Sequence, residues 1–343
     1  MDTKIITNPS EQDIDMLARA LRNGELVSIP TETVYGLGAN GLDPEAMDKI
    51  YVAKGRPSDN PLILHVSNSE SIKPLVTEVS TTAQALMDSF WPGPLTITLP
   101  KSDLVPDRAT GGLPRVALRC PDHDGCRLLL QRAGIPIAAP SANISGRPSP
   151  TTAQDEYNNM NGRISYILDA GPCTIGVEST VVEVHDDKVI ILRPGGITKA
   201  QLETVVSTVE YDTALVNAET KPKAPGMKYT HYAPDAPMTV VVGTPESIAN
   251  TFKELSKGIE GPIGCLVSHE TYELIKADTR FMCHCFGHHG DALALGHDFY
   301  KSLLHFNENH VTLILAEGVN DDGFGVAIMN RMEKASGHHI IYK

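Results

Sequence analysis

Long hydrophobic runs are missing from this sequence of 343 residues, and none of its apolar stretches is long enough to cross a bilayer. Residues 1–12 also lack the basic stretch and apolar core of a signal peptide. We therefore expect a cytoplasmic protein that is not held in a membrane. Hydrophobic residues make up 41% and charged residues 21%, which is typical of folded globular domains and not of disordered chains.

Cysteine is scarce as well. The six cysteines are scattered along the chain, so we expect reduced thiols, as in a cytosolic protein, and no disulfide framework. Cys283 and Cys285, with the neighbouring histidines, could suggest zinc. Their Cys-x-Cys spacing is tighter than in common structural zinc sites, and residues 281–286 also read as a short strand. We expect the strand and no metal held by the protein.

Positive charge is in deficit, with 29 Lys and Arg against 42 Asp and Glu and a net charge of −13. This balance argues against an extended basic face that holds nucleic acid, although a local cationic pocket remains compatible with it.

Hydrophobic periodicity predicts an α/β protein. Ser10 can cap an amphipathic helix that ends near Gly24. The strand-like runs that follow are 26–29, 62–66, 95–99, 116–118, 135–138, 166–168, 181–184 and 189–192, with helical patterns at 44–53, 82–89 and 127–133. The last two runs predict a hairpin, so we expect a mixed sheet.

A second domain is predicted after a proline-rich stretch. Apolar periodicity fades between about 203 and 237, where prolines accumulate, which is typical of a linker. Strands at 238–242, 263–267, 280–285 and 311–316 then alternate with helices at 246–256, 292–306 and 326–335. This alternation predicts a small doubly wound α/β domain.

An anion site is indicated by residues 54–65, which place Lys54, a glycine and Arg56 before an apolar strand. Phosphate binding needs backbone donors at tight turns and cationic side chains. Two cations at the end of a helix can also interact simply with the helix dipole. Polar segments at 30–38 and 140–149 likewise follow apolar runs, and open α/β sheets bind ligands at such strand ends.

These segments together closely resemble the YrdC-like family of threonylcarbamoyl-adenylate synthases. The resemblance continues in the strings at 91–96, 116–121, 176–180 and 192–195, in order over roughly the first two hundred residues. Residues 224–234 resemble the connector of the longer, two-domain members. The resemblance implies a catalytic domain at 1–204 with a twisted mixed sheet and flanking helices, a linker or lid at 205–237, and a smaller Rossmann-like domain at 238–343.

The activity implied by the resemblance joins L-threonine, bicarbonate or CO₂, and ATP into threonylcarbamoyl-AMP and pyrophosphate. The enzyme would be a nucleotidyltransferase that uses Mg²⁺ with ATP and no other cofactor. Its product would pass to a separate tRNA threonylcarbamoyl transferase, and we expect neither stable tRNA binding nor membrane association.

The resemblance also assigns roles to residues. Lys54 and Arg56 are implied as catalytic residues beside the phosphates. L-threonine is implied to contact Thr33, His65, Arg119, Ala139 and Ser179, and ATP to contact Arg56, Asn60, Arg115, Ser141, Ser149, Arg193 and Tyr232. Arg115 stands where the family has a small residue, so a contact there is expected to use backbone atoms. A buried Arg119 could instead belong to an internal ion pair.

Three other functions compete with this interpretation. An RNA-binding module is disfavoured by the acidic total and by the absence of interleaved basic and aromatic residues. Carbamoyl transfer occurs in longer chains with a similar domain and added modules. A hydrolase would need a nucleophile elbow, and the serines of 141–149 contain no Gly-x-Ser-x-Gly.

Overall fold

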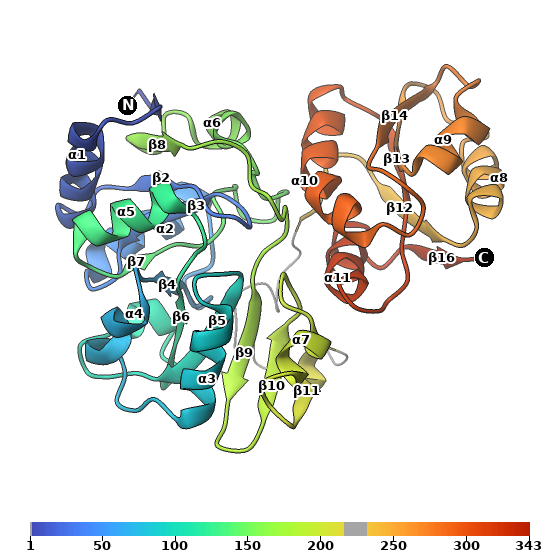
Figure 1. Cartoon of the computed structure of the whole chain (residues 1–343). Coiled ribbons are helices and arrows are strands. Elements are labelled where there is room, and N and C mark those ends of the chain that lie inside the picture. Colours follow the sequence, from blue (N-terminus) through green and yellow to red (C-terminus); the bar gives the residue numbers. More distant parts are fainter. Residues whose placement is uncertain (1, 216–231) are drawn as a thin grey trace. The chain divides into compact units, whose positions relative to one another are not determined.

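The computed structural model describes residues 2–215 and 232–343 (Figure 1). The chain divides into two compact units. Within the described residues, the first contains 2–145, 149–174 and 178–215, and the second contains 232–343 with the short segments 146–148 and 175–177.

An eleven-stranded mixed sheet forms the centre of the first unit. Its spatial order is β1 (Lys4–Thr7), β8 (Tyr166–Asp169), β2 (Val27–Ile29), β3 (Gly36–Asn40), β7 (Ile137–Ala138), β4 (Ile63–His65), β6 (Arg115–Arg119), β5 (Leu95–Pro100), β9 (Thr180–Val184), β10 (Val189–Arg193) and β11 (Val209–Tyr211). Antiparallel pairing of β9 with β10 confirms the predicted hairpin.

Seven helices accompany this sheet in the described residues. The sequence predicted α1 (Glu11–Arg22), α2 (Pro44–Lys54), α3 (Thr81–Phe90) and α5 (Asp124–Ala133). It did not indicate the shorter α4 (Asp107–Thr110), α6 (Ala153–Met160) and α7 (Lys199–Glu203), or the 3₁₀ turns at Ser69–Leu75 and Thr213–Leu215. Ser10 forms a capping box with Asp13 at the start of α1. In α2, Asp43 caps the N-terminus and Gly55 adopts the left-handed conformation just after Lys54, so the sequence fixes where that lysine lies.

Two hydrophobic clusters hold the helices on the sheet. One joins α1 and α5 to strands β2 and β7 through residues such as Leu17 and Leu129. The other joins α2 and α3 to β3 and β4 through residues such as Ile50, Leu86 and Leu64. The helix ends that carry polar residues are therefore anchored by buried apolar faces.

A parallel five-stranded sheet forms the centre of the second unit. Its order is β14 (Phe281–Cys285), β13 (Ile263–Val267), β15 (Leu313–Glu317), β12 (Met238–Val242) and β16 (Ile340–Tyr342). The helices are α8 (Pro245–Leu255), α9 (His269–Ile275), α10 (Ala292–Glu308) and α11 (Gly325–Ala335). The expected doubly wound domain is confirmed.

The structure adds elements that the periodicity did not indicate. Strands β1, β3 and β16 and helix α9 are short, and β11 lies inside the range 205–237 that was expected to be linker. β3 contains Gly38, where a Cβ atom would lie 2.8 Å from the carbonyl oxygen of Val27. Glycine is thus required for close strand approach, although it weakens the strand signal. In the described ranges, no helix combines the length and apolarity that crossing a membrane requires.

Candidate functional site

Strand ends from distant parts of the sequence meet in the first unit. β4 and β6 are parallel, and their last residues, His65 and Arg119, are register partners. β7 pairs with β4 in the antiparallel direction, and the amide of Ala139 donates to the carbonyl of Ile63 at 2.9 Å. Three of the five residues implied for threonine are therefore neighbours by sheet register alone.

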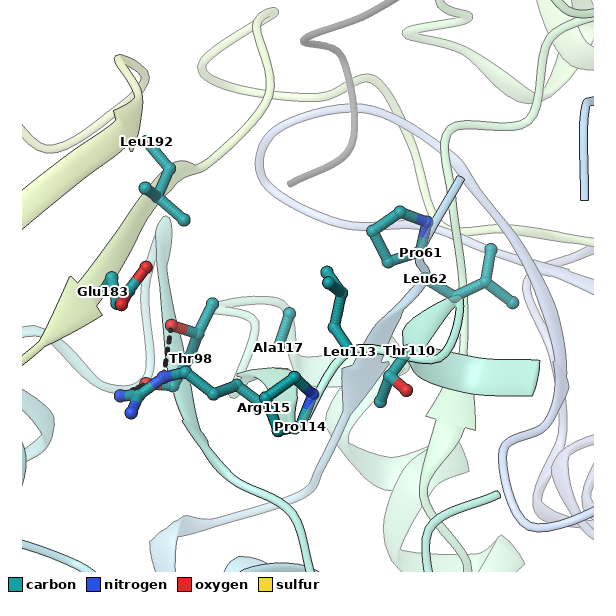
Figure 2. Close-up of a pocket in the computed structure, with 10 residues that line it drawn as sticks. All are labelled: Pro61, Leu62, Thr98, Thr110, Leu113, Pro114, Arg115, Ala117, Glu183 and Leu192. Atoms are coloured by element: carbon teal, nitrogen blue, oxygen red, sulfur yellow. Dashed lines mark hydrogen bonds between the residues drawn. The ribbon is translucent and has the colours of Figure 1, made fainter. Parts of the chain in front are cut away.

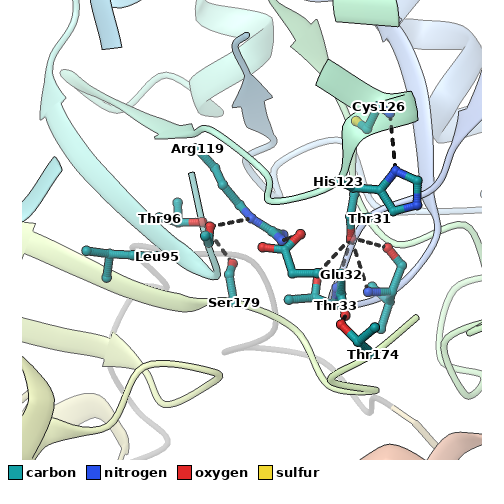
Figure 3. Close-up of polar contacts among 12 residues, drawn as sticks. Thr31, Glu32, Thr33, Leu95, Thr96, Arg119, His123, Cys126, Thr174 and Ser179 are labelled. Atoms are coloured by element: carbon teal, nitrogen blue, oxygen red, sulfur yellow. Dashed lines mark hydrogen bonds and ion pairs between the residues drawn. The ribbon is translucent and has the colours of Figure 1, made fainter. Parts of the chain in front are cut away.

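Arg119 is buried in an ion pair with Glu32 (Figure 3). Nη2 of Arg119 lies 2.7 Å from Oε2 of Glu32, and the two side chains are only 4% and 7% exposed. Nε of Arg119 donates to the carbonyl of Gly93 at 3.4 Å. Among the described residues, neither oxygen of Glu32 nor Nη2 of Arg119 has a hydrogen-bond partner. The internal ion pair that was the alternative for Arg119 is therefore present, and its contact with a ligand carboxylate stays a prediction.

Hydroxyl groups lie beside this pair (Figure 3). The Oγ1 atoms of Thr31 and Thr33 are 2.9 Å apart, and Oγ of Ser179 is 2.8 Å from Oγ1 of Thr96. Arg193 fixes Ser179 by donating to its carbonyl at 2.9 Å and to its hydroxyl at 3.1 Å. The site thus combines a cation, a carboxylate and several hydroxyls, which can recognise a small polar zwitterion.

His65 is a neutral member of this group. Its side chain is buried, and Nδ1 has no hydrogen-bond partner among the residues described. Burial, and next the nearby Arg119, lowers the pKa of His65 to about 3. At neutral pH the imidazole therefore offers a hydrogen bond and no charge.

Lys54 holds the loop that contains Ser141. Its ammonium nitrogen is buried and donates to the carbonyls of Ser141 and Asn143. Oγ of Ser141 donates to Oδ1 of Asn143 at 2.6 Å, and the amide of Ser145 donates to the Lys54 carbonyl at 2.9 Å. Burial, and next the charge of Arg56, lowers the pKa of Lys54 well below its usual value. An incoming polyanion would reverse this shift.

Two buried carboxylates face this loop. Glu156 accepts a hydrogen bond from Ser28, and burial raises the pKa of Glu156 well above its usual range. Glu178 accepts from Oγ of Ser149 at 2.8 Å. Both carboxylates act on Lys54 electrostatically, as opposite charges that favour its protonated form.

Arg56 and Asn60 lie on the segment that follows α2. Nη2 of Arg56 donates to the carbonyl of Pro61 at 3.2 Å, and the carbonyl of the buried Asn60 accepts from the Tyr51 hydroxyl at 3.1 Å. These contacts shape the turn that the sequence indicated as an anion site.

Arg115 lines a mostly apolar pocket of about 180 Å³ (Figure 2). Its guanidinium donates to the carbonyls of Thr98 at 2.7 Å and Val184 at 2.8 Å, and burial lowers its pKa. The pocket is lined by Pro61, Leu62, Thr98, Thr110, Leu113, Pro114, Arg115, Ala117, Glu183 and Leu192. The side chain is thus already engaged with the protein. A nucleotide contact at Arg115 through backbone atoms stays a prediction.

Tyr232 belongs to the second unit. Its ring is buried, lies 5.3 Å from the ring of Tyr300, and has the guanidinium carbon of Arg331 at 5.8 Å. Residues 216–231 of the connector, including the histidine before Tyr232, lie outside the described residues.

Metal ligands do not gather in the described residues, which contain no group of three or more His, Cys, Asp or Glu side chains able to hold an ion. Residues 281–285 form β14, as the sequence predicted, and Nε2 of His284 is 3.0 Å from Oδ2 of Asp298.

Comparison with known families and proteins identifies the chain's relatives. Residues 19–195 match the family described as "Telomere recombination", and residues 197–337 match "Threonylcarbamoyl-AMP synthase, C-terminal domain". The threonylcarbamoyl-AMP synthase of Bacillus subtilis is 45% identical over 333 residues, which cover 97% of this chain and 95% of that protein. The chain belongs to the threonylcarbamoyl-AMP synthase family.

Further similarities cover the full chain. The threonylcarbamoyl-AMP synthase of Pyrococcus abyssi is 43% identical, with 96% of each chain covered. A crystal structure of P. abyssi Sua5 complexed with L-threonine has a TM-score of 0.90 and 40% identity, and covers 100% of both chains. These relatives confirm the expected two-domain form, the fold class and the enzyme class of the family.

Several buried polar residues of the site received no role from the sequence. Glu32, Glu178 and Thr96 lie inside the motif strings at 30–38, 176–180 and 91–96, whereas Glu156 lies outside all of the strings. The signal for the first two was a charged residue within an otherwise small or apolar string, which needs a partner when buried. No comparable signal marks Glu156, since it lies on an ordinary polar helix.

Proposed function

We propose that this chain makes threonylcarbamoyl-AMP from L-threonine, bicarbonate or CO₂, and ATP. The observation that carries the proposal is the buried cluster of Arg119, His65 and hydroxyl groups. It lies in a chain whose relatives are threonylcarbamoyl-AMP synthases. In the proposed reaction, a carbamate oxygen of N-carboxythreonine forms a bond to the α-phosphorus. The bond from that phosphorus to the bridging oxygen breaks, and pyrophosphate leaves with its electrons.

Threonine is proposed to bind at Thr33, His65, Arg119, Ala139 and Ser179. Nη2 of Arg119 makes no hydrogen bond among the described residues and can turn from Glu32 to the ligand carboxylate, and the neutral His65 adds a hydrogen bond without a second charge. The threonine complex of the P. abyssi relative supports this assignment.

ATP is proposed to bind at Arg56, Asn60, Arg115 through its backbone, Ser141, Ser149, Arg193 and Tyr232, with Lys54 and Arg56 stabilising charge on the phosphates. The apolar pocket beside Arg115 can take the base. Mg²⁺ would supply charge neutralisation on the phosphates, and its ligands would come mainly from the triphosphate. Catalysis then depends on positioning and charge, and not on a protein nucleophile.

We further propose, from the sequence, a catalytic domain at 1–204, a lid at 205–237 that brings Tyr232 to the nucleotide, and a separate domain at 238–343. A lid would protect a carbamate and an acyl adenylate, which both decompose in water. The product would pass in the cytoplasm to a separate tRNA threonylcarbamoyl transferase, without stable tRNA binding by this chain.

The test is pyrophosphate release from ATP, measured with and without threonine and with and without bicarbonate. The proposal expects release that requires both additions, and ¹³C from labelled bicarbonate in the adenylate product. Pyrophosphate release that does not depend on threonine would exclude the synthase activity. Pyrophosphate release that requires carbamoyl phosphate would favour carbamoyl transfer. RNA binding without any pyrophosphate release would favour the binding module.

A further inference from the structure

Glu32 has an unusual position for a buried carboxylate. It is 6% exposed, it lies next to Thr33 in the threonine set, and its Oε2 is 2.7 Å from Arg119. Within the described part of the chain, both of its oxygens lack a hydrogen-bond partner. Buried carboxylates normally have their hydrogen bonds satisfied, so this group has acceptor capacity that a ligand can use.

A free amino acid supplies the complementary groups. Its carboxylate can take Nη2 of Arg119 by replacing the Glu32 contact, and its ammonium group can donate to Glu32, whose Oε1 has no hydrogen-bond partner among the described residues. Carbamate formation requires the ammonium to lose a proton first, because only a neutral amine has a lone pair for attack on carbon.

We propose that Glu32 binds the α-ammonium group of threonine and accepts its proton, and so acts as the general base of carbamate formation. This inference rests on the proposed function. One N–H bond breaks, its electron pair stays on nitrogen, and the proton moves to a Glu32 oxygen. The lone pair then forms the N–C bond with CO₂, and the second proton leaves to water. With bicarbonate the same bond forms and water departs.

Substrate binding itself makes Glu32 a better acceptor. In the free protein the guanidinium of Arg119 lies 2.7 Å from the Glu32 carboxylate, so the two opposite charges attract each other. When the threonine carboxylate engages Arg119, it neutralises that charge and places a like charge near Glu32. Binding of the threonine zwitterion therefore favours transfer of its ammonium proton to Glu32.

The other groups near Glu32 are poorly suited to the role. Cys120, Cys126 and Cys173 feel its charge, and burial raises the pKa of all three, that of Cys120 to about 11, so they stay neutral. His65, on the strand beside Arg119, has its pKa lowered to about 3 by burial and is a weak acceptor. Among these groups only Glu32 combines a negative charge with unused acceptors.

The test compares wild type with Glu32→Gln in threonine-dependent pyrophosphate release between pH 6.5 and 9. The expected kcat deficit is about 100-fold at neutral pH, within the range of general-base catalysis. It should shrink by about tenfold for each pH unit, because unprotonated amine then comes from solution. Reporting variant and wild type as a ratio removes the pH dependence of the bicarbonate supply.

Glu317→Gln is the matched control, since Glu317 is also a buried glutamate and lies outside the site. It should keep the wild-type kcat and pH profile. Unchanged kcat for Glu32→Gln, or a deficit constant with pH and confined to the threonine KM, would overturn the proposal and leave Glu32 as a positioning group for Arg119.

Glu32→Asp covers the case in which the Gln variant does not fold. Because it keeps an acceptor, it should show a partial kcat with the wild-type pH profile, and a deficit that shrinks with pH would contradict the base role. If wild type itself releases no pyrophosphate with threonine, the proposed function fails. An active wild type with a flat ratio refutes only the role of Glu32.

Discussion

Glu32 and Glu317 are both buried glutamates close to strand ends, yet their surroundings differ. Glu317 receives hydrogen bonds at 2.9 Å from both the amide and the hydroxyl of Ser268, and its other oxygen is 2.6 Å from Nδ1 of His289. The carboxylate of Glu32 has an ion pair with Arg119 and no hydrogen bond among the described residues. Burial alone therefore does not distinguish a structural carboxylate from one reserved for a ligand, whereas unused hydrogen-bonding capacity does.

The same contrast separates two arginines of the first unit. Arg193 donates to the carbonyl and the hydroxyl of Ser179, so part of its guanidinium is already engaged with the protein. Nη2 of Arg119 has an ion pair with Glu32 but no hydrogen bond among the described residues, so a ligand carboxylate can replace its partner.

Lys54→Met should give the largest loss of stability. The carbonyls of Ser141 and Asn143 lose their buried donor, and each unsatisfied buried group costs about 1–3 kcal/mol. We expect a decrease of about 2–5 kcal/mol in the free energy of unfolding, measured by denaturant titration. A decrease below that of an exposed Lys73→Ala control would show that Lys54 does not hold the loop.

Arg119→Ala should weaken threonine binding far more than ATP binding. Loss of a charge-assisted contact costs about 1.5–3 kcal/mol, hence roughly ten- to a hundredfold in affinity. Calorimetric titration of each ligand measures this, and Arg56→Ala should show the opposite bias. Equal threonine affinity in a folded Arg119→Ala variant would remove Arg119 from the pocket.

His65 should make the protein sensitive to acid. Its pKa is lowered to about 3 in the folded state, against about 6.5 unfolded, so the unfolded state binds more protons between these values. The contribution of His65 to the free energy of unfolding is fully present above pH 6.5. It decreases as the pH falls, and about 2 kcal/mol of it is lost at pH 5.

Denaturant unfolding at pH 7 and pH 5 checks this contribution. His65→Gln should lose that part of the pH dependence, while the exposed His305→Gln control should keep it. The same slope in wild type and His65→Gln would show that His65 is not the group responsible.

Ser268→Ala should give the smallest effect. It removes one hydroxyl contact to Glu317 and the cap of α9, which together cost about 1–2 kcal/mol of stability. Pyrophosphate release should be unchanged, because the second unit carries no residue of the threonine set. A large loss of turnover with little loss of stability would instead place a function at Glu317.

The sequence predicted most of the elements because their signals are local. The cap at Ser10 and the glycine at position 24 predicted the two ends of a helix, which the structure confirms as α1. β3 was missed because its glycines, needed for close packing, resemble a loop. Glu32 and Glu156 were missed because their importance comes from burial beside residues far along the chain, which periodicity does not reveal.

Unsatisfied hydrogen-bonding groups at Glu32 and Arg119 mark the proposed ligand site, and a crystal structure of this chain with threonine bound tests this most directly. We predict the threonine carboxylate within hydrogen-bond distance of Arg119 and its amino group within hydrogen-bond distance of Glu32. Threonine bound elsewhere, with the Arg119–Glu32 contact kept at 2.7 Å, would contradict it.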